Sequence, residues 1–300
     1  MNRFLCFGSL NIDATYRVAH FVTAGETLAA SDVQTFCGGK GLNQSIALAR
    51  AGGTVFHAGR IGTDGAFLLE ALKQAHVNTE LVTVSDREKT GHAIIQTTAD
   101  GENCILLFGG ANRCVTKAQA DFALDRFGRG DLLVLQNEIN RIPYLIKEAK
   151  RRGLTVAFTP APMTDDVHDY PLGETDYILL NETEAGALAA GRGKTESADD
   201  LADTLSQMYP AVRFVLTLGA AGALYAHGQA RVFQRAFPVK AVDTTAAGDT
   251  FAGFFLQSIV AGDHIKQALE TAAKAAAVCV TRNGASPSIP SREELCRPAE

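Results

Sequence analysis

The sequence lacks the long apolar runs and charge blocks by which several protein classes are recognised. No stretch of 18 consecutive apolar residues occurs among its 300 residues, so we expect no transmembrane helix. Lys plus Arg number 28 and Asp plus Glu 33, without a basic block, so neither a nucleic acid nor an anionic membrane is an expected partner. The first residues lead directly into an apolar strand at Phe4, and we therefore expect no signal peptide.

The cysteines and histidines also lack a functional pattern. The six cysteines stand at positions 6, 37, 104, 114, 279 and 296 without a Cys-x-x-Cys pair, and the seven histidines have no metal-ligand spacing. We expect reduced, mostly buried cysteines in a cytoplasmic protein. In that compartment the two glycosylation sequons, at Asn43 and Asn181, are chance matches.

Apolar side chains are abundant, at 46% of the sequence, which is enough for one large domain or two modest ones. From Thr116 onward, strands and helices alternate, which is typical of a parallel sheet flanked by helices. Expected strands cover 131–136, 154–159, 176–180 and 212–218; expected helices cover 116–127, 143–151, 182–190, 198–208 and 263–280. With no internal repeat or linker, we predict one α/β domain over residues 1–300.

The first third of the chain is richer in strands. Helices are expected at about 41–51 and at 64–75, the second burying Phe67, and a strand is expected at 54–58. Extended chain at 14–37 and strands at 81–84, 91–96 and 103–108 have no helices between them, and Asp100-Gly101 marks a hairpin. We interpret these strands as a small sheet that projects from the main body.

A glycine-rich loop, Gly38-Gly39-Lys40-Gly41, precedes the expected helix at 41–51. Glycines let backbone N–H groups approach a ligand closely, and Lys40 adds positive charge. An ordinary loop before a helix would have the same composition, so this motif alone does not define a site. Asn11 and Asp13 lie two residues apart and would face the same side of an extended chain, although a simple turn also fits them.

The stretch from Val242 to Gly253 has the strongest chemical signature. We expect a strand over 233–242, interrupted by Pro238, then a turn of small residues and a helix that begins near Ala246 and ends at Gly262. The free N–H groups of such a helix favour an anion, and Asp249 lies in its first turn, where the helix dipole stabilises negative charge. A carboxylate beside an anion site suits phosphate transfer to an alcohol, whereas a lone first-turn acid commonly only stabilises its helix.

Four polar segments follow expected strands and could meet at one ligand cleft. They are Gln136-Asn137-Glu138, Asn181 to Glu184, Thr217 to Gly222, and Asp243 to Asp249. Each could be structural, since acids favour a first helical turn and the glycines at 219 and 222 fit an ordinary turn. Gly193-Lys194-Thr195 looks like the end of a P-loop, but position 188 is Leu and a helix precedes it, so we reject that interpretation.

Taken together, the motifs resemble the ribokinase (PfkB) family of carbohydrate kinases. The resemblance rests on Gly38-Gly39-Lys40-Gly41-x-Asn43, Asn181-x-x-Glu184 and Asp243-Thr244-x-Ala246-x-Gly248-Asp249-x-Phe251-x-Gly253, and it extends from Phe4 to about Pro290. It implies a ribokinase-like fold whose small sheet, from about 13–37 and 90–109, is a lid. It also implies ATP-dependent phosphorylation of D-ribose at its 5-hydroxyl, with Mg²⁺ and a monovalent cation, K⁺, and a homodimer formed through the lid.

The resemblance further implies a role for each matching residue. Asp249 would be the base, and backbone N–H groups of Ala246, Ala247 and Gly248 would bind the transferring phosphoryl group. The sugar would be held by Asn11, Asp13, Gly38, Gly39, Lys40, Asn43, Glu138 and Asp249. The nucleotide and Mg²⁺ would be held by Asn181, Glu184, Thr217, Gly219, Gly222, Gly248 and Ala273. The monovalent cation would be held by Asp243, Thr245, Cys279, Arg282, Gly284 and Ser288.

Two positions depart from the family pattern. Ala273, next to Lys274, stands where an Asn beside adenine is frequent, and Leu42 replaces a smaller residue in the glycine loop. Kinases of fructose, deoxyribose or nucleosides remain alternatives on the same fold, and so does a non-catalytic sugar sensor. The polar Asn11, Asp13 and Lys40 disfavour a nucleoside, and the intact Asp249 disfavours a sensor.

Overall fold

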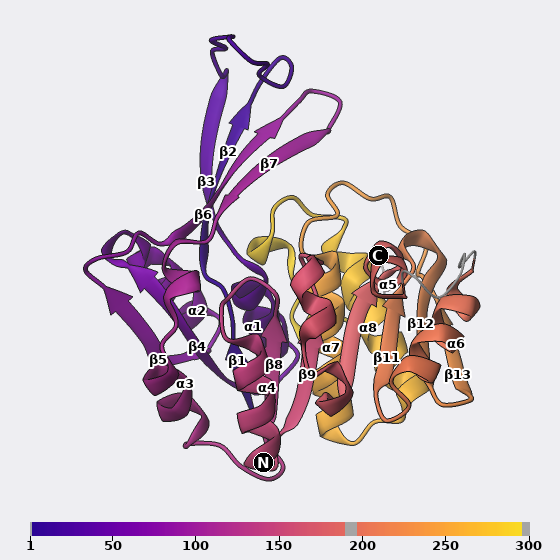
Figure 1. Cartoon of the computed structure of the whole chain (residues 1–300). Coiled ribbons are helices and arrows are strands. Elements are labelled where there is room, and N and C mark those ends of the chain that lie inside the picture. Colours follow the sequence, from indigo (N-terminus) through magenta and orange to yellow (C-terminus); the bar gives the residue numbers. More distant parts are fainter. Residues whose placement is uncertain (1, 190–196, 296–300) are drawn as a thin grey trace.

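A nine-stranded sheet forms the body of the protein in the computed structural model, which describes residues 2–189 and 197–295 (Figure 1). The strand order is β13-β12-β11-β10-β9-β8-β1-β4-β5. The strands are β1 Arg3–Phe7, β4 Thr54–Gly62, β5 Asn78–Ser85, β8 Leu132–Gln136, β9 Thr155–Thr159, β10 Tyr177–Asn181, β11 Arg213–Thr217, β12 Gly222–His227 and β13 Ala230–Arg235. Neighbours pair in parallel except around β12, which is antiparallel to β11 and β13. The predicted α/β fold with a mostly parallel sheet is therefore confirmed.

Helices cover both faces of this sheet, and each layer closes its own apolar core. One layer contains α1 Lys40–Arg50, α2 Ala66–Gln74, α7 Ala247–Ala261 and α8 Ile265–Cys279. The other contains α3 Lys117–Leu124, α4 Ile142–Arg151, α5 Glu182–Ala189 and α6 Ala198–Met208. The short α9, Arg292–Leu295, follows near the carboxyl end. No helix within the described ranges is long and apolar enough to cross a membrane.

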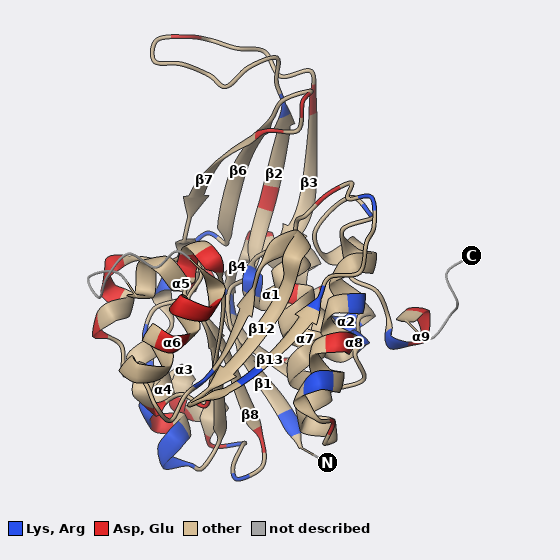
Figure 2. Cartoon of the chain, turned by 90° about the vertical axis from the view of Figure 1, so that its right-hand side faces the viewer, with Lys and Arg blue, Asp and Glu red and all other residues tan. Residues whose placement is uncertain are grey.

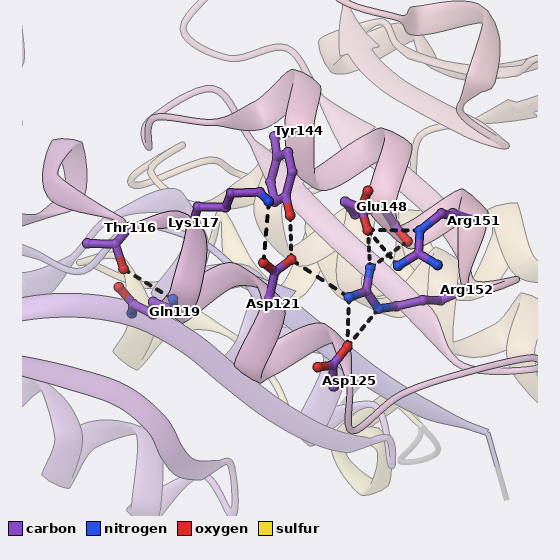
Figure 3. A network of polar contacts seen from close by, with 9 residues as sticks. All are labelled: Thr116, Lys117, Gln119, Asp121, Asp125, Tyr144, Glu148, Arg151 and Arg152. Atoms are coloured by element: carbon purple, nitrogen blue, oxygen red, sulfur yellow. Dashed lines mark hydrogen bonds and ion pairs between the residues drawn. The ribbon is translucent and has the colours of Figure 1, made fainter.

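A polar network joins α3 to α4 on the outer surface (Figure 3). Arg152, at the end of α4, contacts Asp125 at 2.6 Å and Asp121 at 3.7 Å, and also pairs with Glu148. Tyr144 donates a hydrogen bond to Asp121, which raises the pKa of the phenol to about 12. The carboxylates of Asp121, Asp125 and Glu148 are partly exposed, so each pair contributes little, and together the contacts hold α3 and α4 side by side.

A second sheet of four strands rises from the body (Figure 1). Its order is β3-β2-β6-β7, built from β2 Asn11–Arg17, β3 Asp32–Gly38, β6 Gly91–Thr97 and β7 Asn103–Phe108. β6 and β7 contain no Asp, Glu, Lys or Arg, and Figure 2 shows charge on this sheet confined to a few positions of β2, β3 and the loops. Large apolar side chains are exposed on it, among them Ile105 at 57% and Leu106 at 68%.

The strand predictions failed in three places. The strand expected at 81–84 lies in β5, which pairs in parallel with β4 of the large sheet because α2 provides the crossover between them. The strand expected over 233–242 ends at Arg235, and the following segment, which contains Pro238 with its missing N–H, is irregular up to α7. β12 was not foreseen, because Thr217 to Gly222 was interpreted only as a turn.

Two burial predictions were also wrong. Phe67 is 39% exposed on α2, whose inner face is formed by Leu68 and Leu72. Of the five described cysteines, all free, only Cys6 and Cys279 are buried. Cys37 and Cys114 are half-buried, and Cys104 is exposed because it lies on β7, where every residue is exposed. The rejected P-loop match at 193–195 and Cys296 lie outside the described residues.

Candidate active site

A cleft of about 220 Å³ opens where the carboxyl ends of β9, β10 and β11 face the beginning of α7. It is lined by Lys40, Thr159, Ala161, Leu179, Leu180, Asn181, Glu184, Thr217, Thr244, Ala246, Ala247, Gly248, Asp249, Phe251 and Ala252. Adjacent strands β1 and β8 end beside the same edge, and their next residues are Gly8-Ser9 and Asn137-Glu138. In open α/β sheets this edge is the usual ligand-binding position.

The helix predicted near Ala246 is α7, which begins at Ala247 and is followed by Gly262 in a left-handed conformation. Ala246 itself has φ = 60°, an unfavourable backbone conformation for a residue other than glycine and one that functional turns often retain. The Ala247 N–H donates to the carbonyl of Thr244 at 3.2 Å. The N–H groups of Gly248 and Asp249 have no partner among the described residues and point from the end of α7, where an anion is favoured.

Asp249 is buried, at 8% exposure, and both of its carboxylate oxygens accept hydrogen bonds from α1. Asn43 Nδ2 donates to Oδ2 at 3.1 Å, and Gln44 Nε2 donates to Oδ1 at 3.0 Å. Helices α1 and α7 cross closely at Gly253, where a Cβ would lie 2.4 Å from Ala47 Cβ. This crossing brings the glycine loop and the predicted base together.

Glu138 connects the glycine loop to the end of β8. Its carboxylate accepts a hydrogen bond from the Lys40 backbone N–H at 3.0 Å and another from the Ser9 hydroxyl. Burial raises the pKa of Glu138, opposed by the positive charge of Lys40. The pKa of Lys40 is raised mainly by Asp249 and further by Glu138, although burial opposes this. The ammonium group of Lys40 thus lies within the electrostatic influence of both the Asp249 and the Glu138 carboxylates.

Asn11 and Asp13 extend the cluster onto the small sheet. Asn11 Oδ1 accepts a hydrogen bond from Asn112 Nδ2 at 2.7 Å, and a Cβ on Gly38 would lie 1.9 Å from Asp13 Oδ2. A larger side chain at position 38 would therefore displace the Asp13 carboxylate from this position. Burial, with the charge of Glu138, raises the pKa of Asp13 to about 7.

The residues predicted for nucleotide and Mg²⁺ binding are brought only partly together. Asn181 and Glu184 line the cleft and cap α5 reciprocally, since the Asn181 N–H donates to Glu184 Oε2 at 2.9 Å and the Glu184 N–H to Asn181 Oδ1 at 2.8 Å. Thr217 also lines the cleft. Gly219 and Gly222 follow it with positive φ, whereas Ala273 is buried in α8 and does not line the cleft.

The residues predicted to hold a monovalent cation form one connected cluster behind the α7 turn. Asp243 accepts hydrogen bonds from the N–H groups of Thr245 at 2.8 Å and Gly284 at 2.9 Å. These bonds lower the pKa of Asp243 although burial opposes them. The remaining members are linked as well: Cys279 Sγ lies 3.1 Å from Ser288 Oγ, and the Arg282 N–H donates to the Cys279 carbonyl at 3.1 Å.

The donor sets fit hard cations. The Asp243 carboxylate accepts two backbone N–H bonds and could still offer oxygen to a cation, and the second oxygen of Glu184, Oε1, is not used in the α5 cap. No group of three or more His, Cys, Asp or Glu side chains that could hold a metal occurs in the part of the chain that the structure describes. A cation here would therefore depend on backbone oxygens and water.

No individual role was predicted from the sequence for four polar residues of the site: Ser9, Gln44, Asn112 and Thr159. Ser9 bonds to Glu138, Asn112 to Asn11, and Gln44 to Asp249. Thr159 ends β9 and lines the cleft. The position of Thr159 after a buried strand was an available signal, but the contact of Asn112 with Asn11 is formed across 101 residues and left no local pattern.

Comparisons with known proteins agree with this architecture. The sequence matches the pfkB family of carbohydrate kinases over residues 1–292. It is 36% identical to a ribokinase of Staphylococcus aureus (strain COL), with 98% of each chain covered, and 30% identical to a deoxyribokinase of Salmonella typhi, with 96% and 95% covered. The structure of Arabidopsis thaliana ribokinase complexed with ribose and ATP is 29% identical, covers 99% of this chain and 98% of its own, and superimposes with a TM-score of 0.87. The chain therefore belongs to the pfkB family of carbohydrate kinases.

Proposed function

We propose that this protein transfers the γ-phosphoryl group of ATP to the 5-hydroxyl of D-ribose, giving D-ribose 5-phosphate and ADP. The observation that carries the proposal is the hydrogen-bonded arrangement of Asp249 with Asn43 at the N-terminus of α7, beside the cleft. The similarity to ribokinases, one of them solved with ribose and ATP, supports the choice of ribose.

In this proposal the sugar lies between the small sheet and α1. Its hydroxyls would bond to Asn11, Asp13, Glu138 and Asn43. The Oδ1 atom of Asn43 is buried and has no hydrogen-bond partner among the described residues. Backbone atoms of Gly38, Gly39 and Lys40 would complete the contacts. A buried acceptor without a partner is costly, and a sugar hydroxyl would satisfy it.

Asp249 would accept the proton of the 5-hydroxyl while the sugar oxygen forms its bond to the γ-phosphorus and the bond to the β-phosphate oxygen breaks. Negative charge would be stabilised by Lys40 and by backbone N–H groups of the turn formed by Ala246, Ala247 and Gly248. The Ala247 N–H would have to share its hydrogen with the Thr244 carbonyl, to which it donates in this structure. Positioning and charge stabilisation are the main requirements of phosphoryl transfer. A base of this kind contributes about 10²- to 10⁴-fold.

The nucleotide would lie along Asn181, Glu184 and Thr217 and continue past Gly219 and Gly222 toward Ala273. Mg²⁺ would neutralise phosphate charge near Glu184, largely through bound water. K⁺ would be held by Asp243 with oxygens of Thr245, Cys279, Arg282, Gly284 and Ser288. Its effect would be to fix the turn that precedes α7.

The small sheet, with about 13–37 and 90–109, would act as a lid within a single domain over residues 1–300. A lid excludes water, which would otherwise compete with the sugar as acceptor. The exposed apolar side chains of β7 support dimerisation through this lid, because so large an apolar surface is unusual on a monomer. The five free cysteines support a cytoplasmic location.

A coupled assay with ATP, Mg²⁺, K⁺ and a panel of sugars tests the proposal. Ribose should give the highest kcat/KM, above 2-deoxyribose, fructose and nucleosides. Deoxyribose is the second candidate because of the deoxyribokinase relative, and a clear preference for it would replace ribose as the substrate. Calorimetric binding of ribose without any turnover would instead indicate a sugar sensor.

A further inference from the structure

We propose that Gln44 and Gln136 are positioning residues that orient the carboxylate of Asp249 through a directed chain of buried amides. This inference rests on the proposed function, in which Asp249 is the base. Gln44 lies on α1 and Gln136 at the end of β8, and they are 1% and 0% exposed. Neither belongs to the sugar or nucleotide contacts described above.

The chain is continuous from the base to the core of the sheet. Gln44 Nε2 donates to Asp249 Oδ1 at 3.0 Å, and Gln136 Nε2 donates to Gln44 Oε1 at 2.7 Å. The second hydrogen of each amide also has an acceptor. For Gln44 it is Thr159 Oγ1 at 3.4 Å, and for Gln136 it is Cys6 Sγ at 3.6 Å.

The direction of the chain follows from the chemistry at its ends. An ionised carboxylate only accepts hydrogen bonds, so the Gln44 atom that faces Asp249 must be Nε2, and Oε1 must face Gln136. Gln136 must in turn present Nε2. At the far end, burial raises the pKa of Cys6 to about 11, so the thiol keeps its hydrogen and donates it to the Gly41 carbonyl at 3.4 Å.

This direction matters because an amide can be reversed. If Gln44 were free to rotate, its Oε1 could face the Asp249 carboxylate and repel it. The bond from Gln136 opposes that alternative, since reversal of Gln44 alone would leave two donors facing each other, and the Gln136 amide is itself held by its second bond, to Cys6 Sγ. Gln44 and Asn43 then occupy one lone pair on each oxygen of Asp249, and the remaining lone pairs stay available for a sugar hydroxyl.

Single and double substitutions in the full-length protein test the proposal. Gln44→Met and Gln136→Met keep similar volume and remove the amide, and Gln44→Asn keeps an amide that is one methylene too short. Gln257→Met on α7 is a matched control, because Gln257 makes no hydrogen bond to Asp249 or to the two glutamines in the described structure. The measurements are kcat, ribose Kd by calorimetry, and Tm.

We expect Gln44→Met to lower kcat by about 10- to 150-fold, the worth of a hydrogen bond to a charged group, with ribose Kd changed by less than about threefold. Gln136→Met should lower kcat by about two- to tenfold. In the Gln44→Met background, Gln136→Met should have almost no further effect on kcat, since it acts only through Gln44. Gln44→Asn should behave as Gln44→Met, and Gln257→Met should retain normal kcat.

Two results would overturn the proposal. One is a loss of Tm in the glutamine variants with kcat unchanged, which would mean that the amides only stabilise the fold. The other is an additive double variant, which would mean that Gln136 does not act through Gln44. Either result together with an inactive Asp249→Asn leaves the proposed base in place, whereas an active Asp249→Asn contradicts the proposed function itself.

Discussion

Asn43 Nδ2 donates a hydrogen bond to Asp249 Oδ2 at 3.1 Å, which joins the first turn of α1 to the first turn of α7 across 206 residues of sequence. Asn43 lies in α1 directly after the glycine loop, and Asp249 lies at the end of α7 that faces the cleft. A ligand that contacts both would span the proposed acceptor and phosphoryl positions. The catalytic geometry therefore depends on how α1 and α7 are held together.

Asp249→Asn should lower kcat by about 10²- to 10⁴-fold because the amide cannot accept the hydroxyl proton. Nucleotide binding, measured by calorimetry, should remain close to that of the wild type. An asparagine also offers one acceptor oxygen to two donors, Asn43 and Gln44, so we expect a loss of about 1–3 kcal/mol in the free energy of unfolding. Turnover near the wild-type rate in a correctly folded variant would remove Asp249 as the base.

Gly253→Ala tests the helix crossing directly. The new Cβ would lie 2.4 Å from Ala47 Cβ and 2.8 Å from the Leu48 backbone nitrogen, so α1 and α7 would have to separate. We expect a loss of about 1–3 kcal/mol in urea unfolding, together with lower kcat. Gly186→Ala on α5 is the matched control, because a Cβ there meets nothing within 4 Å and should stabilise the helix by about 0.5–1 kcal/mol. Equal effects of the two substitutions would contradict this explanation.

Local patterns in the sequence predicted most elements of the body. Helical spacing, the turn of small residues before it and the stop at Gly262 located α7, and the alternation after Thr116 predicted the parallel strands and their helices. Helical spacing, helix ends and strand–helix alternation are formed by residues close together in the chain, so the sequence alone can predict them. The position of Asp249 relative to the glycine loop came instead from the resemblance to a family.

Features formed by distant residues could not be predicted. Whether strand 81–84 joins the large or the small sheet depends on its pairing with β4, which no residue within the strand specifies. The segment before α7 is fixed by bonds from the Val242 and Asp243 N–H groups to the Val280 carbonyl, so tertiary contacts override its strand-like composition. The amide chain through Gln136 likewise needs three elements to meet.

Asp13→Asn should flatten the pH dependence of stability. In the unfolded chain this carboxyl ionises near its ordinary pKa of 3.8, but burial beside Glu138 raises the folded pKa to about 7. Its contribution to stability is therefore complete below about pH 4 and is lost as pH rises toward and through 7. A rise of this size is worth at most about 4 kcal/mol, of which about 2–3 kcal/mol falls between pH 5 and 8.

Urea unfolding at pH 5 and pH 8 measures this difference. The wild type should lose more stability across the interval than Asp13→Asn does. Asp100→Asn is the control, because a hydrogen bond from Thr98 lowers the pKa of Asp100, so that carboxyl is ionised at both pH values. Parallel pH dependences of the wild type and Asp13→Asn would show that the Asp13 carboxyl is not held protonated by its surroundings.

The exposed apolar side chains of the small sheet predict that charged residues placed on β7 would prevent dimerisation. Ile105 and Leu106 alternate across β7, so the double substitution Ile105→Lys/Leu106→Lys places a charge on each face of the edge strand. Sedimentation velocity should give a dimer for the wild type and a monomer for the variant. Phe122→Lys on α3, where the side chain is 55% exposed, should leave the dimer intact. A wild-type monomer at assay concentrations would contradict dimerisation through the lid.

Removal of K⁺ should slow catalysis through the turn that precedes α7. Asp243 accepts hydrogen bonds from the N–H groups of Thr245 and Gly284. A cation held beside Asp243 would therefore connect this turn to the loop after α8. It would also fix the backbone N–H groups proposed to face the phosphoryl group. Replacing K⁺ with tetramethylammonium should lower kcat by about 10- to 100-fold, the effect of a small displacement of a catalytic group. Asp243→Asn should have a low kcat in either salt, because it loses the charge that holds the cation. Asp199→Asn, in the exposed first turn of α6, is the control and should keep the full response to K⁺. A wild-type rate that is the same in both salts would remove the cation from the mechanism and leave Asp243 as a residue that only shapes the turn.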